Sequence, residues 1–125
     1  MQDHKNFRIW QDGIQLVKDF YEVCKKFPKS EEYVLAAQIR RAVISIPANI
    51  AEGASRRSQK DFYRFLEIAL GSAFELDTFL QIIFDLNYIS ESEFRLLCDK
   101  VDKERKMIYL FMSKLEKEQQ AKRTA

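Results

Sequence analysis

The apolar residues of this chain recur at steps of three and four along almost its whole length. That spacing places them on one side of an α-helix, and it breaks only at short segments of turn-forming residues. With 3 glycines and 2 prolines among 125 residues, the chain has little material for the turns of an all-β fold. Four periodic segments of helical length follow one another, so the sequence predicts an all-α protein.

The first two helices are bounded by a proline and a serine. The first begins near Phe7 and ends at Phe27, because Pro28 pushes the residue before it out of the α region. Ser30 is the expected N-cap of the second helix, which reaches Gly53.

The last two helices each begin after a serine. Ser58 is expected to cap the third helix, which closes at Asn87, and Ser90 forms a capping box with Glu93 at the start of the fourth. Residues 119–125 are expected to fray. Connections of a few residues force neighbouring helices to run antiparallel, so residues 1–118 are predicted to form one up-down-up-down four-helix bundle.

The first and third helices carry wide apolar arcs. The expected core seam of the first helix is Phe7, Trp10, Ile14, Val17, Tyr21 and Cys24. A second stripe contains Leu16, Phe20, Val23 and Phe27, and the third helix has another in Tyr63, Leu70 and Phe74. Such arcs indicate a self-association surface, and the alternative is that large aromatic side chains only flank the core.

Polar residues interrupt the second helix and the facing side of the third. Pro47 lacks an N–H group, so the second helix is expected to be kinked or interrupted there, with Ser45 and Asn49 satisfying the freed backbone groups. We predict a structural polar cluster of Arg40, Arg41, Ser45, Asn49, Glu52, Glu67 and Glu75.

The carboxylates of this cluster raise the question of a metal centre. Dinuclear sites in bundles use paired Glu-x-x-His motifs, whereas the single histidine, His4, lies outside the helices. Buried ion pairs with arginines are therefore expected, with no metal and no cofactor.

The cysteines and the absence of recognisable motifs argue against secreted, membrane-spanning and enzymatic proteins. Cys24 and Cys98 are far apart and lie on apolar stripes, which indicates free thiols in a reducing compartment. No secretory signal pattern, membrane-spanning run, nucleophile motif or phosphate loop is recognisable. We expect a cytoplasmic protein that is not an enzyme, with no membrane contact and no small-molecule substrate.

Basic residues gather around the start of the third helix. Arg56, Arg57, Lys60 and Arg64 lie beside the free N–H groups of that helix, where they are predicted to bind nucleic acid. Lys114, Lys117, Lys122 and Arg123 can extend this surface from the fourth helix.

Three motifs carry a family resemblance: Gln-Ile-Arg-Arg-Ala at 38–42, Ser-Ile-Pro-Ala-Asn-Ile-Ala-Glu-Gly at 45–53 and Phe-Leu-Glu-Ile-Ala-Leu-Gly-Ser at 65–72. With them the chain closely resembles the bacterial four-helix-bundle proteins of the 23S rRNA intervening-sequence family, also labelled S23 ribosomal proteins. The resemblance implies homo-oligomers, notably ring-shaped pentamers, and a nucleic-acid-binding basic surface in related proteins.

The leading hypothesis is a non-enzymatic, oligomeric protein that binds nucleic acid, with structured RNA favoured over DNA. The alternative is a protein–protein interaction or assembly module without nucleic-acid binding. A third hypothesis, a metal-dependent enzyme, rests on the carboxylates alone.

Overall fold

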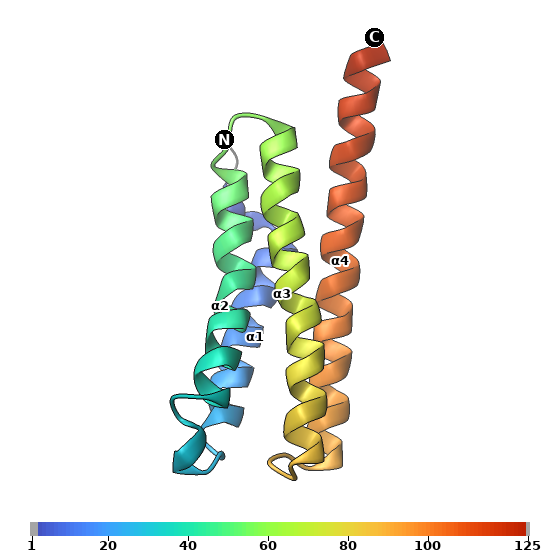
Figure 1. Cartoon of the computed structure of the whole chain (residues 1–125). Helices are drawn as coiled ribbons and strands as arrows, with labels where there is room; N and C mark the ends of the chain where they lie inside the picture. The colour runs from blue at the N-terminus through green and yellow to red at the C-terminus, as the bar shows by residue number, and fades with distance from the viewer. Residues whose placement is uncertain (1–2, 125) are drawn as a thin grey trace.

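The computed structural model describes residues 3–124 as an antiparallel bundle of four helices (Figure 1). Helices that follow one another in the sequence pack side by side, and α1 contacts α4 to close the bundle. No β-strand occurs in the described part of the chain, so the predicted all-α, up-down-up-down fold is confirmed. The helices are α1 (Arg8–Cys24), α2 (Leu35–Ala54), α3 (Gln59–Asp85) and α4 (Glu91–Thr124).

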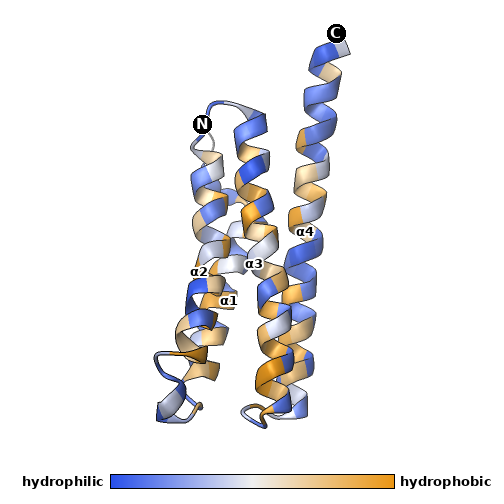
Figure 2. Ribbon diagram, viewed as in Figure 1, coloured by the Kyte–Doolittle hydropathy of each residue, from blue (hydrophilic) through white to orange (hydrophobic). Residues whose placement is uncertain are grey.

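The core runs along the bundle axis between the apolar faces of the helices (Figure 2). Each large apolar side chain buried there stabilises the fold by roughly 1.5–3 kcal/mol. The largest of those with no solvent contact are Phe20, Ile39, Ile46, Ile50, Leu66, Leu76, Leu80, Ile83 and Ile108.

The buried face of α1 differs from the predicted seam. Of that seam only Cys24 is buried, whereas Trp10, Ile14 and Val17 are half-buried and Tyr21 is exposed. The residues that α1 buries are Ile9, Gly13, Leu16, Phe20, Val23 and Cys24. The second apolar stripe is therefore core, and the prediction that it serves self-association is wrong.

Gly13 explains why α1 turns this face inward. A Cβ atom there would lie 3.1 Å from Glu104 Oε2 and 3.4 Å from side-chain atoms of both Ile46 and Pro47. The missing side chain lets the backbone of α1 approach α2 and α4 at this level. The spacing of apolar residues does not reveal this contact, because glycine has no side chain to contribute to an apolar stripe.

Small residues bring α2 and α3 together. Ala42 of α2 and Ala69 and Ala73 of α3 have no solvent contact. At the end of α2, a Cβ atom on Gly53 would lie 2.7 Å from Phe62 Cδ1 and 3.2 Å from the Phe62 carbonyl oxygen. The backbones of α2 and α3 are therefore in close contact next to the α2–α3 connection.

The two serine caps predicted for α3 and α4 are confirmed. Ser58 Oγ accepts from the Asp61 N–H at 3.1 Å. Ser90 and Glu93 form a complete capping box, because each side chain accepts from the other residue's N–H at 3.1 Å.

The predicted Ser30 cap is wrong, because Ser30 lies inside the 3₁₀-helix η2 (Lys29–Glu31) and α2 begins only at Leu35. Tertiary hydrogen bonds hold this connection out of the helix. Glu31 accepts from the Tyr88 hydroxyl at 3.0 Å, and Arg40 donates to both the carbonyl and the carboxylate of Glu32.

The end of α3 is closed by a Schellman motif. Tyr88 N–H donates to the Ile83 carbonyl and Asn87 N–H to the Phe84 carbonyl. Asn87 has a φ of 62°, a left-handed conformation that asparagine tolerates better than most residues. The prediction that α3 closes at Asn87 is confirmed.

Two helices continue further than expected. α2 stays helical through Pro47, so it is not interrupted there. α4 remains helical to Thr124, where fraying was expected beyond Glu118, and its last turns rise past the other helices (Figure 1).

The two helical glycines Gly53 and Gly71 should respond oppositely to alanine. Gly53→Ala forces the Phe62 ring or the backbone to shift and should lower the free energy of unfolding by about 1–3 kcal/mol. At Gly71 an added Cβ meets nothing within 4 Å, so Gly71→Ala should stabilise the protein by about 0.5–1 kcal/mol through helix propensity. Urea unfolding followed by circular dichroism measures both, and equal effects would contradict the close α2–α3 approach.

Candidate nucleic-acid interface

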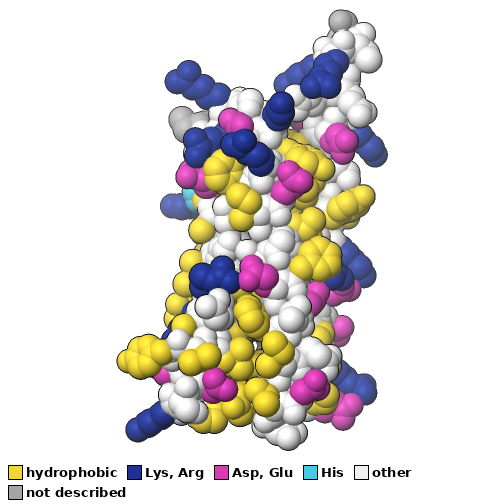
Figure 3. Space-filling model, in the orientation of Figure 1, with side chains coloured by type: hydrophobic (Ala, Val, Ile, Leu, Met, Phe, Trp, Pro, Cys, Tyr) yellow, Lys and Arg dark blue, Asp and Glu magenta, His cyan; other side chains and the backbone are white. Residues whose placement is uncertain are grey.

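The basic residues predicted to bind nucleic acid lie at one end of the bundle. This end comprises the α2–α3 connection and the last turns of α4, and Figure 3 shows dark blue side chains gathered over both. Segments 52–64 and 114–123 together hold eight Lys and Arg residues against four Asp and Glu residues.

Two clefts run between the start of α3 and the end of α4, and we call them the basic clefts. One has a volume of about 320 Å³ and is lined by Arg57, Ser58, Gln59, Gln119, Lys122 and Arg123. The other, of about 260 Å³, is lined by Gln59, Lys60, Tyr63, Leu115, Glu116, Gln119, Gln120 and Arg123. The fold thus brings the two basic segments together, whereas Lys114 and Lys117 are exposed but line neither cleft.

The four predicted binding residues differ in their bonding. Arg56 lies 3.4 Å from the carboxylate of Glu52 and stacks 4.8 Å above the Phe65 ring, so it holds the helix ends together. Arg64 pairs with Asp61 at 3.8 Å.

Arg57 and Lys60 make no side-chain hydrogen bond or ion pair within residues 3–124. Both are exposed, and each lines one of the basic clefts. Of the four predicted binding residues, these two are the ones free to contact a ligand.

An aromatic cluster joins the starts of α1 and α3 to α4. The rings of Phe7 and Phe111 meet edge to face with centroids 5.0 Å apart, and Phe62 lies 6.1 Å from the first and 5.4 Å from the second. Pairs of this kind contribute about 0.5–1.5 kcal/mol beyond their buried area. They fix the starts of α1 and α3 against α4 at the level of Phe111.

The predicted structural polar cluster divides into separate parts. Asn49 donates to the carbonyl and the hydroxyl of Ser45 at 2.8 and 2.9 Å, and Ser72 of α3 donates to the same hydroxyl at 2.9 Å. Ser45 therefore links α2 to α3. The expected role as partner of the backbone group freed by Pro47 is wrong, since that group is the Val43 carbonyl.

Of the expected ion pairs, only that of Arg41 with Glu75 spans α2 and α3, at 2.8 Å. Both side chains are about half exposed rather than buried, so the pair contributes at most about 1 kcal/mol. Arg40 pairs with Glu32 instead. The remaining acids, Glu52 near Arg56 and the exposed Glu67, take no part in the Ser45 network.

Glu104 is a buried charged residue that was not predicted from the sequence. It occupies the core face of α4 between Val101 and Ile108, and its side chain is 1% exposed. Neither carboxylate oxygen has a hydrogen-bond partner among the described residues. Burial, together with the charge of Asp12, raises the pKa of Glu104 to about 8. The signal was present in the sequence, because position 104 lies three residues after Val101 and four before Ile108, which is the spacing of one helix face.

Thiol chemistry and metal binding find little support among the described residues. Cys24 is buried and Cys98 half-buried, both are free, and burial raises the pKa of Cys24 to about 11, so its thiolate is scarce at neutral pH. Within residues 3–124, no group of three or more His, Cys, Asp or Glu side chains is placed to hold a metal ion. Among the described helices, none combines the length and the apolar character needed to cross a membrane.

Comparison with known proteins identifies the family. The model of the 23S rRNA-intervening sequence protein family matches residues 5–110. The chain belongs to this family. The match ends within α4, so the matched range includes Arg57 and Lys60 but not Lys122 and Arg123, which line the same clefts.

A solved structure shows the same fold. It comes from Bacteroides thetaiotaomicron and is described as a protein with unknown function from the S23 ribosomal protein family. It is 24% identical, the alignment covers 83% of this chain and 97% of that one, and the TM-score is 0.78. A search of curated proteins found no match.

The buried carboxyl of Glu104 should make stability depend on pH. Its folded-state pKa lies above its ordinary value of 4.5. With respect to this group, the free energy of unfolding is therefore highest below about pH 4.5 and decreases as the pH rises toward about 8. Glu104→Gln keeps the shape and removes the titration. Urea unfolding across this range should show the variant gaining several kcal/mol relative to the wild type. A constant difference between the two proteins would contradict a neutral, buried Glu104.

Proposed function

We propose that this protein is a non-enzymatic, cytoplasmic oligomer that binds nucleic acid in the basic clefts, with structured RNA as the favoured ligand. The observation that carries the proposal is the meeting of Arg57 and Lys60 with Lys122 and Arg123. These pairs lie far apart in the sequence, and only the fold brings them to one surface.

The chemistry of the basic clefts suits a phosphate backbone. Arg57 and Lys60 have no carboxylate partner among residues 3–124, and the N–H groups of the first turn of α3 lack intrahelical acceptors. The positive end of the α3 dipole adds to the attraction for phosphate. Binding of this kind releases counterions and weakens steeply with salt.

Two features support RNA as the ligand. The 23S rRNA-intervening sequence family is named for a segment of ribosomal RNA. Tyr63 lines one basic cleft and offers an aromatic ring to an unstacked base, which single-stranded loops of folded RNA present more often than duplexes do.

An apolar groove between α3 and α4 supports self-association. Its volume is about 410 Å³, and Phe74, Tyr109 and Leu110 are 52%, 61% and 66% exposed. Leu70 completes its apolar lining, and Arg105 stacks 4.9 Å above the Phe74 ring at its edge. Apolar surface of this kind is typical of an interface, and a second copy of the chain is the proposed occupant.

The proposed assembly is a ring, with five copies as the number implied by the family resemblance. A ring needs two different surfaces that meet head to tail, and the apolar groove supplies one of them. The alternative function, an assembly module without nucleic acid, needs the groove but not the basic clefts.

Removing the free basic charges should separate these functions. Arg57→Gln with Lys60→Gln should weaken RNA binding and lower the slope of log affinity against log salt by about 2. The control is Lys18→Gln with Lys29→Gln, which removes the same charge from α1 and from the end of the bundle opposite the basic clefts. It should leave the affinity and the salt slope unchanged. Fluorescence anisotropy with a hairpin RNA gives the slopes. Wild-type protein that binds no RNA at low salt would leave the assembly module as the function.

A charge in the apolar groove should disrupt the oligomer. Leu110→Glu places a carboxylate in the groove and should shift the protein toward monomer, while the exposed side chain leaves folding intact. Leu96→Glu is the matched control, since Leu96 is also exposed on α4 but lies about 21 Å along the helix. Light scattering coupled to size exclusion gives the masses, and an unchanged mass for Leu110→Glu would remove the groove from the interface.

A further inference from the structure

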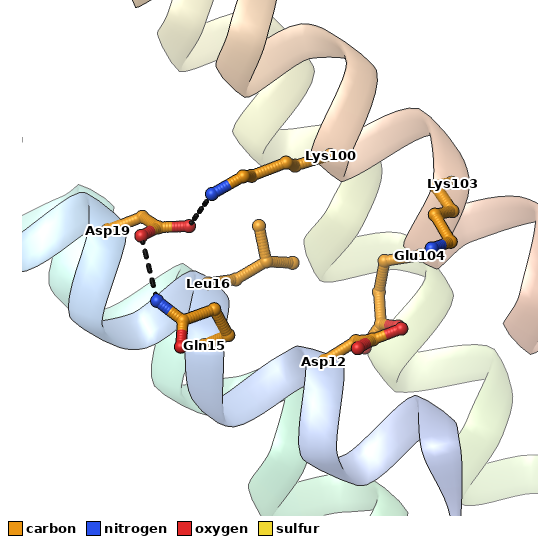
Figure 4. Close-up of a pocket in the computed structure, with 7 residues that line it drawn as sticks. All are labelled: Asp12, Gln15, Leu16, Asp19, Lys100, Lys103 and Glu104. Atoms are coloured by element: carbon orange, nitrogen blue, oxygen red, sulfur yellow. Dashed lines mark hydrogen bonds and ion pairs between the residues drawn. The ribbon is translucent and has the colours of Figure 1, made fainter.

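A further cleft lies between α1 and α4, on the pair of neighbouring helices with the sparsest packing. We call it the acidic cleft, and its volume is about 140 Å³. Figure 4 shows side chains from the two helices facing one another across it. Its lining consists of Asp12, Gln15, Leu16 and Asp19 from α1 and Lys100, Lys103 and Glu104 from α4.

Glu104 forms the inner end of the acidic cleft. Its carboxylate lies against the bare backbone of Gly13, which also faces Ile46 and Pro47 of α2. Ile46 has no polar side-chain atom, and Pro47 has no N–H group, so this wall offers Glu104 no donor. A buried, ionised carboxylate without donors is disfavoured by several kcal/mol, so the charged form of Glu104 needs a partner that the described residues do not supply.

The outer part of the acidic cleft is already paired. Lys100 donates to Asp19 at 2.9 Å, Gln15 donates to the same carboxylate at 3.1 Å, and Arg8 holds Asp12 from outside at 3.0 Å. Asp12 lies beside Glu104 (Figure 4). Three carboxyl groups line the cleft, and two of them have ion-pair partners, because Asp19 pairs with Lys100 and Asp12 with Arg8. An ionised Glu104 is the carboxylate of the lining that has no such partner among the described residues.

We infer that the acidic cleft binds a small organic cation whose N–H groups donate to Glu104, with the charge of Asp12 adding to the attraction. An ionised carboxylate only accepts hydrogen bonds, which selects a guanidinium or primary ammonium group. A metal ion is the weaker alternative, because no group of three or more metal-ligating side chains is assembled within residues 3–124. The inference is independent of nucleic-acid binding.

Binding exchanges one cation for one proton. The pKa of Glu104 is raised to about 8 by burial and by Asp12, so near neutral pH the empty site holds a proton on this carboxyl. The incoming cation takes the place of that proton, which passes to solvent, and the net charge of the cleft is unchanged. Affinity for the cation should therefore rise with pH up to about 8.

Guanidinium and urea form a matched pair of probes. They share a planar shape and N–H donors, but only guanidinium is charged. In ¹H–¹⁵N spectra of the intact protein, guanidinium at millimolar concentration should shift the Gly13 amide in a saturable way, and urea should not. Calorimetry in two buffers of different ionisation enthalpy should show close to one proton released per cation near pH 7.

Two variants test the assignment. Glu104→Gln should weaken guanidinium binding at least about tenfold and abolish proton release, and Asp12→Asn should weaken it about threefold while proton release persists. Equal shifts with urea, unaltered binding by Glu104→Gln, or no saturable shift would overturn the inference. It would also fail if carboxyl ¹³C titration gave Glu104 an ordinary pKa, because the residue would then already be paired in solution.

Discussion

The close packing of α2 on α3 is the constraint on which the rest of the structure depends. Alanines line the contact, Ser45 and Ser72 bond across it, and Gly53 leaves no room for a side chain beside Phe62. A central pair held this tightly fixes where the α2–α3 connection lies, and therefore where Arg57 is presented. α1 and α4 then pack on this pair, and their looser contact with each other leaves room for the acidic cleft.

Much of this architecture was predictable because its signals are local. Helix period depends on residues three and four apart, and the caps at Ser58 and Ser90 depend on residues within one turn. The failures involve distant partners. Ser30 does not cap α2 because Tyr88 and Arg40 hold the preceding connection. The wrong face was assigned to α1 because its apolar arc is wide enough for two orientations, and contacts with other helices choose between them.

The candidate interface was half predictable for the same reason. Arg56, Arg57, Lys60 and Arg64 form a cluster in the sequence. Their bonding divides them into two that have a carboxylate partner, Arg56 and Arg64, and two that have none among the described residues. Glu104 was not predicted because a glutamate between the apolar residues Val101 and Ile108 interrupts the apolar spacing of α4. Its environment comes from Gly13 and Pro47, whose contribution is an absent side chain and an absent N–H group. Absent groups leave little trace in a periodic pattern.

The overhang of α4 gives the basic end a direction. Beyond Leu115, the last buried residue of the helix, α4 continues to Thr124 for about 14 Å, so one wall of the basic clefts stands higher than the other. In a ring, rotation about the symmetry axis would place this projecting part of α4 on the same side of the ring in every copy. A ring would then carry one projecting basic end of α4 per copy, all on the same side, and one long polyanion would contact several of them at once. Avidity would depend on the number of α4 ends that the polyanion contacts rather than on the charge of a single copy.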